Sequence, residues 1–246
     1  AHDDAFSSKP KTTTLLLLLR RRTQQQHCCW NRLHDFVRKL HWASAGMAST
    51  NLGSVQRAAD LIRAYITETP VLSSASISQE IGDDIKVFMK CECFQRTGSF
   101  KFRGALNAIL SYEIENGPIK SVVTHSSGNH GKALALAARA RGIVAHVVMP
   151  EDAPQVKKDA VRDAGGKVVL VPNNYEARKR AAKQIQEREG ALLIHSSHDH
   201  RVMSGQGTLA LEFLAQVARQ GEALDVIVCP VGGGGLVAGV ARAVEG

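Results

Sequence analysis

The sequence predicts an α/β fold built on parallel β-sheets that are covered by helices on both faces. The first indication is a series of short, continuously apolar runs, which have the composition of strands buried on both sides. The second is that these runs alternate with longer segments of helical period over most of the chain. Such alternation is typical of the strand–helix–strand connections that parallel sheets require.

The elements can be placed by their periods and by the residues that interrupt them. The first expected helix lies over 54–65, where apolar residues recur at helical spacing. A strand over 85–94 and a helix over 99–113 follow. Beyond these, strands and helices are expected to alternate, beginning with a strand, over 121–125, 129–141, 143–149, 154–164, 167–171, 175–189, 192–195, 203–220, 225–230 and 236–244.

Lys101 lies at the centre of the stretch Thr97 to Ala105, between Phe100 and Phe102. A lysine taken alone is usually a solvated surface residue. Apolar surroundings instead disfavour its charged form, which lowers its pKa and frees the amine to condense with an aldehyde. The stretch therefore makes Lys101 a candidate nucleophile.

Four consecutive glycines, Gly232, Gly233, Gly234 and Gly235, follow an apolar run and precede a helical segment. Such a loop lets backbone N–H groups close around a phosphate, with the positive end of the next helix behind them. Taken alone, the run is equally compatible with a nicotinamide-binding turn, because Gly233, Gly235 and Ala238 fit the dinucleotide fingerprint. An aldehyde-reactive lysine together with a phosphate loop favours pyridoxal 5'-phosphate.

A third stretch, Ser126 to Gly131, follows an expected strand and opens an expected helix. The free N–H groups of a helix start can bind an anion. An ordinary helix cap is the alternative for a Ser-Gly-Asn turn taken alone.

These three stretches, in this order and spacing, resemble the serine racemase and serine/threonine dehydratase family of pyridoxal-phosphate enzymes. This group has the fold called type II, with the tryptophan synthase β-like architecture. The similarity covers about residues 53–246 and includes Cys91 to Gln95 and Ser204 to Thr208.

The resemblance implies two parallel-sheet α/β domains with the cofactor between them. The small domain corresponds to 114–199, and the large one to 48–113 and 200–246. In the family the large domain continues further, so we expect its C-terminal part to be missing here, with the chain apparently truncated.

The resemblance also implies residue roles. Lys101 joins the cofactor and then acts as the base on one face of the substrate, and Ser127 acts as acid or base on the other face. The implied cofactor-binding residues are Phe100, Lys101, Asn129, Gly232, Gly233, Gly234 and Gly235. The implied substrate-binding residues are Ser126, Ser127, Asn129, His130 and Ser197. No metal ligand is implied within this sequence, and a divalent cation, Mg or Ca, is expected only in the full-length parent.

The implied activity is interconversion of L- and D-serine, with β-elimination of serine to pyruvate and ammonia. The alternatives are an L-serine/L-threonine dehydratase and a catalytically incomplete fragment of either enzyme. We expect a small amino-acid substrate, serine or threonine, and a homodimer in the full-length form.

Two positions depart from the family pattern. Ser196-Ser197 stand where a Pro followed by Asn or an aromatic residue is usual, in a loop that touches substrate in the relatives. Lys132 stands where the animal racemases have Gln in their nucleotide-effector site. Substrate preference and regulation by ATP therefore stay open.

Two clusters contain residue types that ligate metals. His195, His198, Asp199 and His200 have loosely metal-like spacing, and we interpret them as a polar loop between a strand and a helix. Cys91-Glu92-Cys93 lacks the longer separation that is usual between paired cysteine ligands. Neither cluster predicts a metal centre.

Residues 1–47 have no helix or strand period and consist largely of runs of Thr, Leu, Arg and Gln. We interpret them as a low-complexity leader, expect them to be disordered, and take Met47 as the natural start. A truncated transit peptide is the alternative.

Composition excludes several classes of partner. The net charge is +8, but residues 1–46 carry +5 of it, which leaves a weak basic footprint and predicts no nucleic-acid partner. No apolar run approaches the roughly 18 residues of a membrane span, so we expect no membrane association. Five cysteines without a disulfide framework indicate reduced thiols and a cytoplasmic protein.

Overall fold

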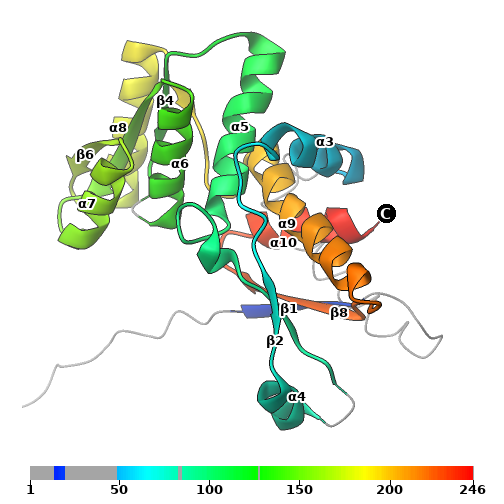
Figure 1. Ribbon diagram of the computed structural model, residues 1–246. Helices are drawn as coiled ribbons and strands as arrows, with labels where there is room; N and C mark the ends of the chain where they lie inside the picture. The colour runs from blue at the N-terminus through cyan, green and yellow to red at the C-terminus, as the bar shows by residue number, and fades with distance from the viewer. Residues whose placement is uncertain (1–13, 20–48, 83–84, 127, 246) are drawn as a thin grey trace, which may run out of the picture.

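Four parallel strands form a sheet in the order β6-β5-β4-β7 in the computed structural model, which describes residues 14–19, 49–82, 85–126 and 128–245. The strands are Ser121–Thr124 (β4), Val144–Pro150 (β5), Lys167–Val171 (β6) and Leu192–Leu193 (β7). A helix connects each strand to the next one in sequence. The predicted parallel α/β arrangement is therefore confirmed (Figure 1).

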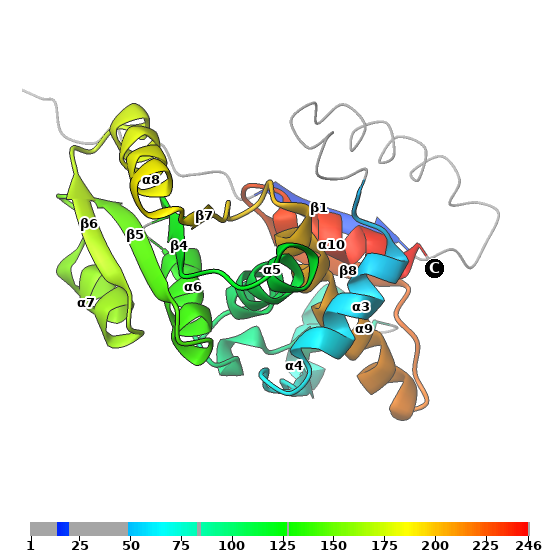
Figure 2. The ribbon, with the colours of Figure 1, turned by 90° about the horizontal axis from the view of Figure 1, so that it is seen from above.

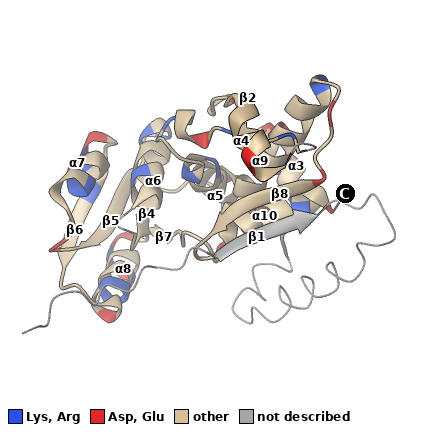
Figure 3. Cartoon of the chain, turned by 90° about the horizontal axis from the view of Figure 1, so that it is seen from below, with Lys and Arg blue, Asp and Glu red and all other residues tan. Residues whose placement is uncertain are grey.

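Helices cover both faces of this sheet. Figure 2 shows α8 (Tyr175–Glu189) on one face and α6 (Asn129–Ala140) and α7 (Gln155–Asp163) on the other. Side chains of successive strand residues point to opposite faces, so Val122 packs with the α6 side while Val123 packs with the α8 side. This two-sided burial explains why β4 and β5 contain no Lys, Arg, Asp or Glu, whereas α7 and α8 carry many (Figure 3).

Local signals set the ends of the helices where the sequence predicted them well. The side chain of Asn174 caps α8 by accepting the N–H of Ala177 at 2.7 Å. Gly190 ends the same helix in the left-handed conformation, with φ of 63°. The predicted range 175–189 is therefore confirmed at both ends.

A second group of helices packs beside the sheet. It contains α3 (Leu52–Ile62), α5 (Lys101–Asn116), α9 (His200–Arg219) and α10 (Gly235–Val244). Strand β8 (Val226–Val231) lies between α9 and α10 in sequence. The predicted helices over 54–65, 99–113, 203–220 and 236–244 are confirmed, with shifts of a few residues at their ends.

Strand β1 (Thr14–Leu19) pairs antiparallel with β8, so Leu16 lies opposite Cys229 and Leu19 opposite Val226. The expectation of disorder is wrong for this segment, and the rest of residues 1–47 lies outside the described residues. A physical reason is available, because an exposed strand edge has unpaired N–H and C=O groups and a run of leucines can pair with it.

The region before Lys101 also differs from the prediction. The expected strand over 85–94 is a short strand, β3 (Phe88–Lys90), followed by a 3-10 turn, η2 (Glu92–Phe94). The chain turns at η2 because the side chain of Glu92 is buried rather than alternating outward. Strand β2 (Val71–Ser73), which pairs with β3, and helix α4 (Ala75–Ile81) were not predicted.

The expected division into domains at residues 113/114 and 199/200 stays a prediction. Helix α5 crosses the first boundary, and one buried apolar cluster joins Phe102 and Leu106 of α5 with Val122 and Leu134 of the sheet layer. No helix in the described part of the chain is long and apolar enough to cross a membrane.

Glycines allow the helices around α9 to approach closely. A Cβ at Gly205 would lie 2.6 Å from Gly104 Cα on α5, and a Cβ at Gly239 of α10 would lie 2.6 Å from Gly207 N on α9. No Cβ is tolerated at such distances from backbone atoms, which cannot move aside as a flexible side chain can. The α5–α9 and α9–α10 contacts therefore depend on these glycines.

We predict that Gly239→Ala destabilises the fold by about 1–3 kcal/mol, because the new methyl group overpacks a backbone contact. Gly53→Ala is the matched control, since its Cβ would make only ordinary contacts in a partly exposed helical turn, and it should raise stability by up to about 1 kcal/mol. Denaturant unfolding measures both. An unchanged unfolding midpoint for Gly239→Ala would contradict the prediction.

Candidate active site

Lys101 is the first residue of α5, and its side chain is largely removed from water. Nζ donates a hydrogen bond to the backbone carbonyl of Ser196 at 3.1 Å and lies 5.1 Å from the centroid of the Phe100 ring. Burial lowers the pKa of Lys101 from 10.5 to about 8, because desolvation penalises the ammonium form. The amine is therefore partly neutral at mildly alkaline pH, as the sequence predicted.

The glycine loop connects β8 to α10. Gly234 caps α10 with φ of 85°, a conformation that favours glycine. A Cβ at Gly233 would clash with the side chain of Ser197, whereas a Cβ at Gly232 or Gly234 would meet no atom within 4 Å. The loop thus presses on Ser197 with one side and faces open space with the other, beside the free N–H groups of the α10 start.

The 126–131 loop leads from β4 into α6, and Asn129 at the start of the helix is exposed. His130 is buried, with Nε2 3.4 Å from the carbonyl oxygen of Ile194. Burial, reinforced by the charge of Lys101, lowers the pKa of His130 to about 3, so its ring is neutral at neutral pH. Ser127 lies outside the described residues.

These three stretches meet at the segment that follows β7. Its carbonyls accept from His130 at Ile194 and from Lys101 at Ser196, and the next residue, Ser197, packs against the glycine loop. The structure thus brings Lys101, His130, Ser197, Gly233 and Gly235 together. It does not give the side chains of Ser126 or Asn129 a described contact with this group.

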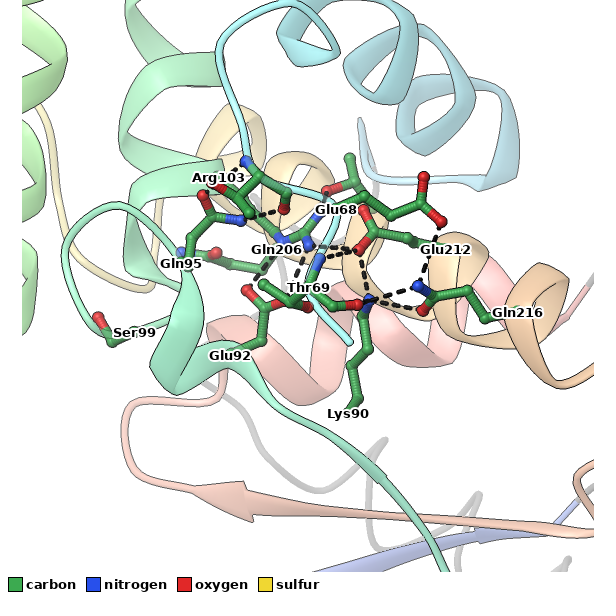
Figure 4. Close-up of polar contacts among 12 residues, drawn as sticks. Glu68, Thr69, Lys90, Glu92, Gln95, Ser99, Arg103, Gln206, Glu212 and Gln216 are labelled. Carbon is green, nitrogen blue, oxygen red and sulfur yellow. Dashed lines mark hydrogen bonds and ion pairs between the residues drawn. The ribbon is translucent and has the colours of Figure 1, made fainter. Parts of the chain in front are cut away.

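Arg103 lies one half-turn beyond Lys101 on α5 and is completely buried (Figure 4). Its guanidinium binds Glu92 through Nε at 2.9 Å and Nη2 at 2.8 Å, and binds Glu212 of α9 through Nη1 at 2.9 Å. Lys90 of β3 pairs with the same Glu212 carboxylate. We call Arg103, Glu92, Glu212 and Lys90 the Arg103 cluster.

The charges in the Arg103 cluster balance, with two cations and two carboxylates. Burial alone would raise the pKa of Glu212, but hydrogen bonds from Arg103 and Lys90 hold that pKa below its usual value. Thr69 completes the network, since its hydroxyl donates to Glu92 at 2.6 Å and its N–H donates to Glu212 at 3.0 Å. Every carboxylate in the cluster is therefore hydrogen-bonded, as buried charges must be.

The sequence reasoning missed this cluster as a unit. Arg103 was recognised only as part of the lysine stretch, and Glu92 only as a member of a disfavoured metal motif. Glu212 lies 109 residues beyond Arg103 and was not singled out. A signal existed, because Glu212 is a charged residue inside the apolar run 209–214, which indicates a buried partner.

Comparison with known proteins identifies the class. Residues 62–246 match the family described as pyridoxal-phosphate dependent enzyme, and the chain belongs to this family. Serine racemase from Arabidopsis thaliana is 47% identical over 192 residues, which cover 78% of this chain and 56% of that protein. The chain therefore spans little more than half the length of this relative.

Two solved structures are similar in fold. Maize serine racemase superposes with a TM-score of 0.72 at 41% identity, covering 80% of this chain and 58% of that one. A bacterial-type threonine deaminase, from the organism abbreviated T.th., superposes with a TM-score of 0.70 at 39% identity, covering 79% of this chain and 61% of that one. The predicted family and type II fold are confirmed.

The described residues fit the family's cofactor. Lys101 presents a buried, weakly basic amine suited to an aldehyde, and the open side of Gly232 and Gly234 leaves room for a phosphate at the α10 start. The cofactor-binding roles expected for Phe100 and Lys101 agree with this placement, although the individual contacts stay predictions.

We predict that Arg103→Leu destabilises the protein by about 3–5 kcal/mol, because it leaves the buried Glu92 and Glu212 carboxylates without their main partner. Arg63→Leu is the control, since Arg63 also pairs with a carboxylate at 2.9 Å but is exposed, and its loss should cost less than about 1 kcal/mol. Urea unfolding of both variants compares them. Equal losses would show that burial does not govern the Arg103 cluster.

Proposed function

We propose that this chain carries the catalytic lysine of a serine racemase, which interconverts L- and D-serine and also eliminates water from serine to give pyruvate and ammonia. The observation that carries the proposal is the Lys101 amine, which is buried against the Ser196 carbonyl beside the glycine loop. The 47% identity with the Arabidopsis serine racemase supports the same activity.

The mechanism assigns each group one task. Pyridoxal phosphate, when bound, supplies an electron sink for the negative charge that forms at the substrate Cα. Lys101 Nζ, neutral above a pH of about 8, takes or returns the Cα proton on one face. Ser127 exchanges a proton on the opposite face, a role that rests on the family resemblance.

Substrate orientation depends on the 126–131 loop. Its N–H groups, at the positive end of α6, bind the substrate carboxylate, with Ser126 and Asn129 as further donors. His130 is neutral and buried, so it acts by holding this loop against Ile194 rather than by carrying a charge to the substrate. Ser197 borders the same space from the glycine loop side.

An L-serine/L-threonine dehydratase is the second candidate. The observation that favours it is the structural similarity to a threonine deaminase at 39% identity. The proposal for the complete protein also includes a homodimer and a divalent cation. Within the described residues no group of acidic, His or Cys side chains is arranged to hold a metal ion, so no step is assigned to the cation.

We predict that the chain, incubated with pyridoxal phosphate and L-serine, forms both D-serine and pyruvate. Lys101→Ala should form neither, and Ser127→Ala should lose D-serine formation by about 10²–10⁴-fold while keeping elimination, because only racemisation needs a second acid or base. Chiral chromatography and a pyruvate assay measure the two products.

Each other outcome selects an alternative. Pyruvate without D-serine from the parent chain would replace the racemase with the dehydratase. Neither product would identify the chain as catalytically incomplete. Racemisation by Ser127→Ala at the parental rate would contradict the role of Ser127.

A further inference from the structure

His195 lies at the start of the segment where the three site stretches meet. Its Nδ1 accepts the backbone N–H of Ser197 at 3.3 Å and that of His198 at 3.2 Å. The same Nδ1 lies 2.9 Å from His198 Nδ1. One ring atom therefore binds groups from two successive residues and closes a turn over Ser196.

These contacts fix the tautomer of His195. A ring nitrogen that accepts two N–H groups cannot carry a proton, so a neutral His195 has its hydrogen on Nε2. The close pair of Nδ1 atoms then requires the proton to belong to His198, because two lone pairs would repel. Burial and the neighbouring His198 lower the pKa of His195 to about 4, which keeps Nδ1 an acceptor at neutral pH.

Packing holds the ring in place. The His195 ring makes edge-on contacts with His198, at a centroid distance of 4.3 Å, and with His125 at the end of β4, at 5.4 Å. The His125 ring in turn contacts Tyr175 of α8 at 5.8 Å. The acceptor atom is therefore set by residues of both the sheet and α8.

The turn that His195 closes determines two contacts of the candidate site. The Ser196 carbonyl, inside the turn, accepts from Lys101 Nζ. The Ser197 side chain, at the first donor residue, packs against Gly233 and Gly235. A side chain that accepts N–H groups two and three residues ahead is the arrangement of an Asx turn, for which asparagine is the usual residue.

We propose that His195 is a positioning residue whose Nδ1 closes the 195–198 turn and thereby holds the Ser196 carbonyl on the Lys101 amine and Ser197 against the glycine loop. The inference rests on the proposed function, because it assigns His195 to the same site. It gives the histidine cluster noted in the sequence a structural task in place of metal binding.

The test compares His195→Asn with His195→Ala in the full chain. Asparagine can offer Oδ1 where His195 offers Nδ1, whereas alanine offers no acceptor. The readout is the apparent pKa of Lys101, obtained from the rate of acetylation by acetic anhydride against pH, with the labelled peptides quantified by mass spectrometry. The exposed Lys157 in the same samples is the internal control.

We expect a Lys101 pKa of about 8 in the parent and in His195→Asn. In His195→Ala the loosened turn admits water to Lys101, so its pKa should rise by about one unit or more and its labelling at pH 7 should slow at least about tenfold. Labelling of Lys157 should be equal in all three proteins, which a general loss of folding would not give.

Two results would overturn the inference. Parental labelling of Lys101 in His195→Ala would show that the turn does not depend on His195. A His195→Asn variant that behaves like His195→Ala would show that ring packing, and not the acceptor atom, matters. The labelling uses no cofactor or substrate, so a failure of the proposed function would leave the difference between the variants intact.

Discussion

The pairing of buried Arg103 with two carboxylates is the interaction on which the rest of the structure depends. It joins α5 to η2 through Glu92 and to α9 through Glu212, and all of these groups are removed from water. A buried ion pair adds little net stability, but each member is costly to leave alone, so the three elements have one favourable arrangement. That arrangement fixes the first turn of α5, which also carries Lys101.

Close helix packing reinforces the same turn. Gly104 of α5 meets Gly205 of α9, and the buried Gln206 accepts the Gly104 N–H at 3.2 Å. This bond satisfies one of the N–H groups that a helix start leaves free. With its helix anchored on one side, Lys101 projects to the other, where the segment after β7 supplies the Ser196 carbonyl. The buried amine is thus a consequence of two sets of contacts on opposite sides of α5.

Much of the fold could be predicted because its signals are local. The apolar runs of β4 to β6 and the caps of α8 each lie within a few residues of sequence, and the motifs around Lys101 and Gly232 to Gly235 indicated the cofactor. The rest depends on contacts between distant residues. Glu212 meets Arg103 across 109 residues, and β1 pairs with β8 from the other end of the chain. The Ser196 contact uses a backbone carbonyl, which no side-chain pattern encodes.

The central claim is that the fold makes Lys101 the lysine that reacts with the cofactor's aldehyde. The most direct measurement is borohydride trapping of the chain with pyridoxal phosphate across a pH series, followed by peptide mapping, with Lys101→Ala as the control. We predict labelling of Lys101 with a midpoint near pH 8, because burial lowers its pKa from 10.5. Labelling of exposed lysines such as Lys157 with none on Lys101, or equal labelling of the control, would contradict the account.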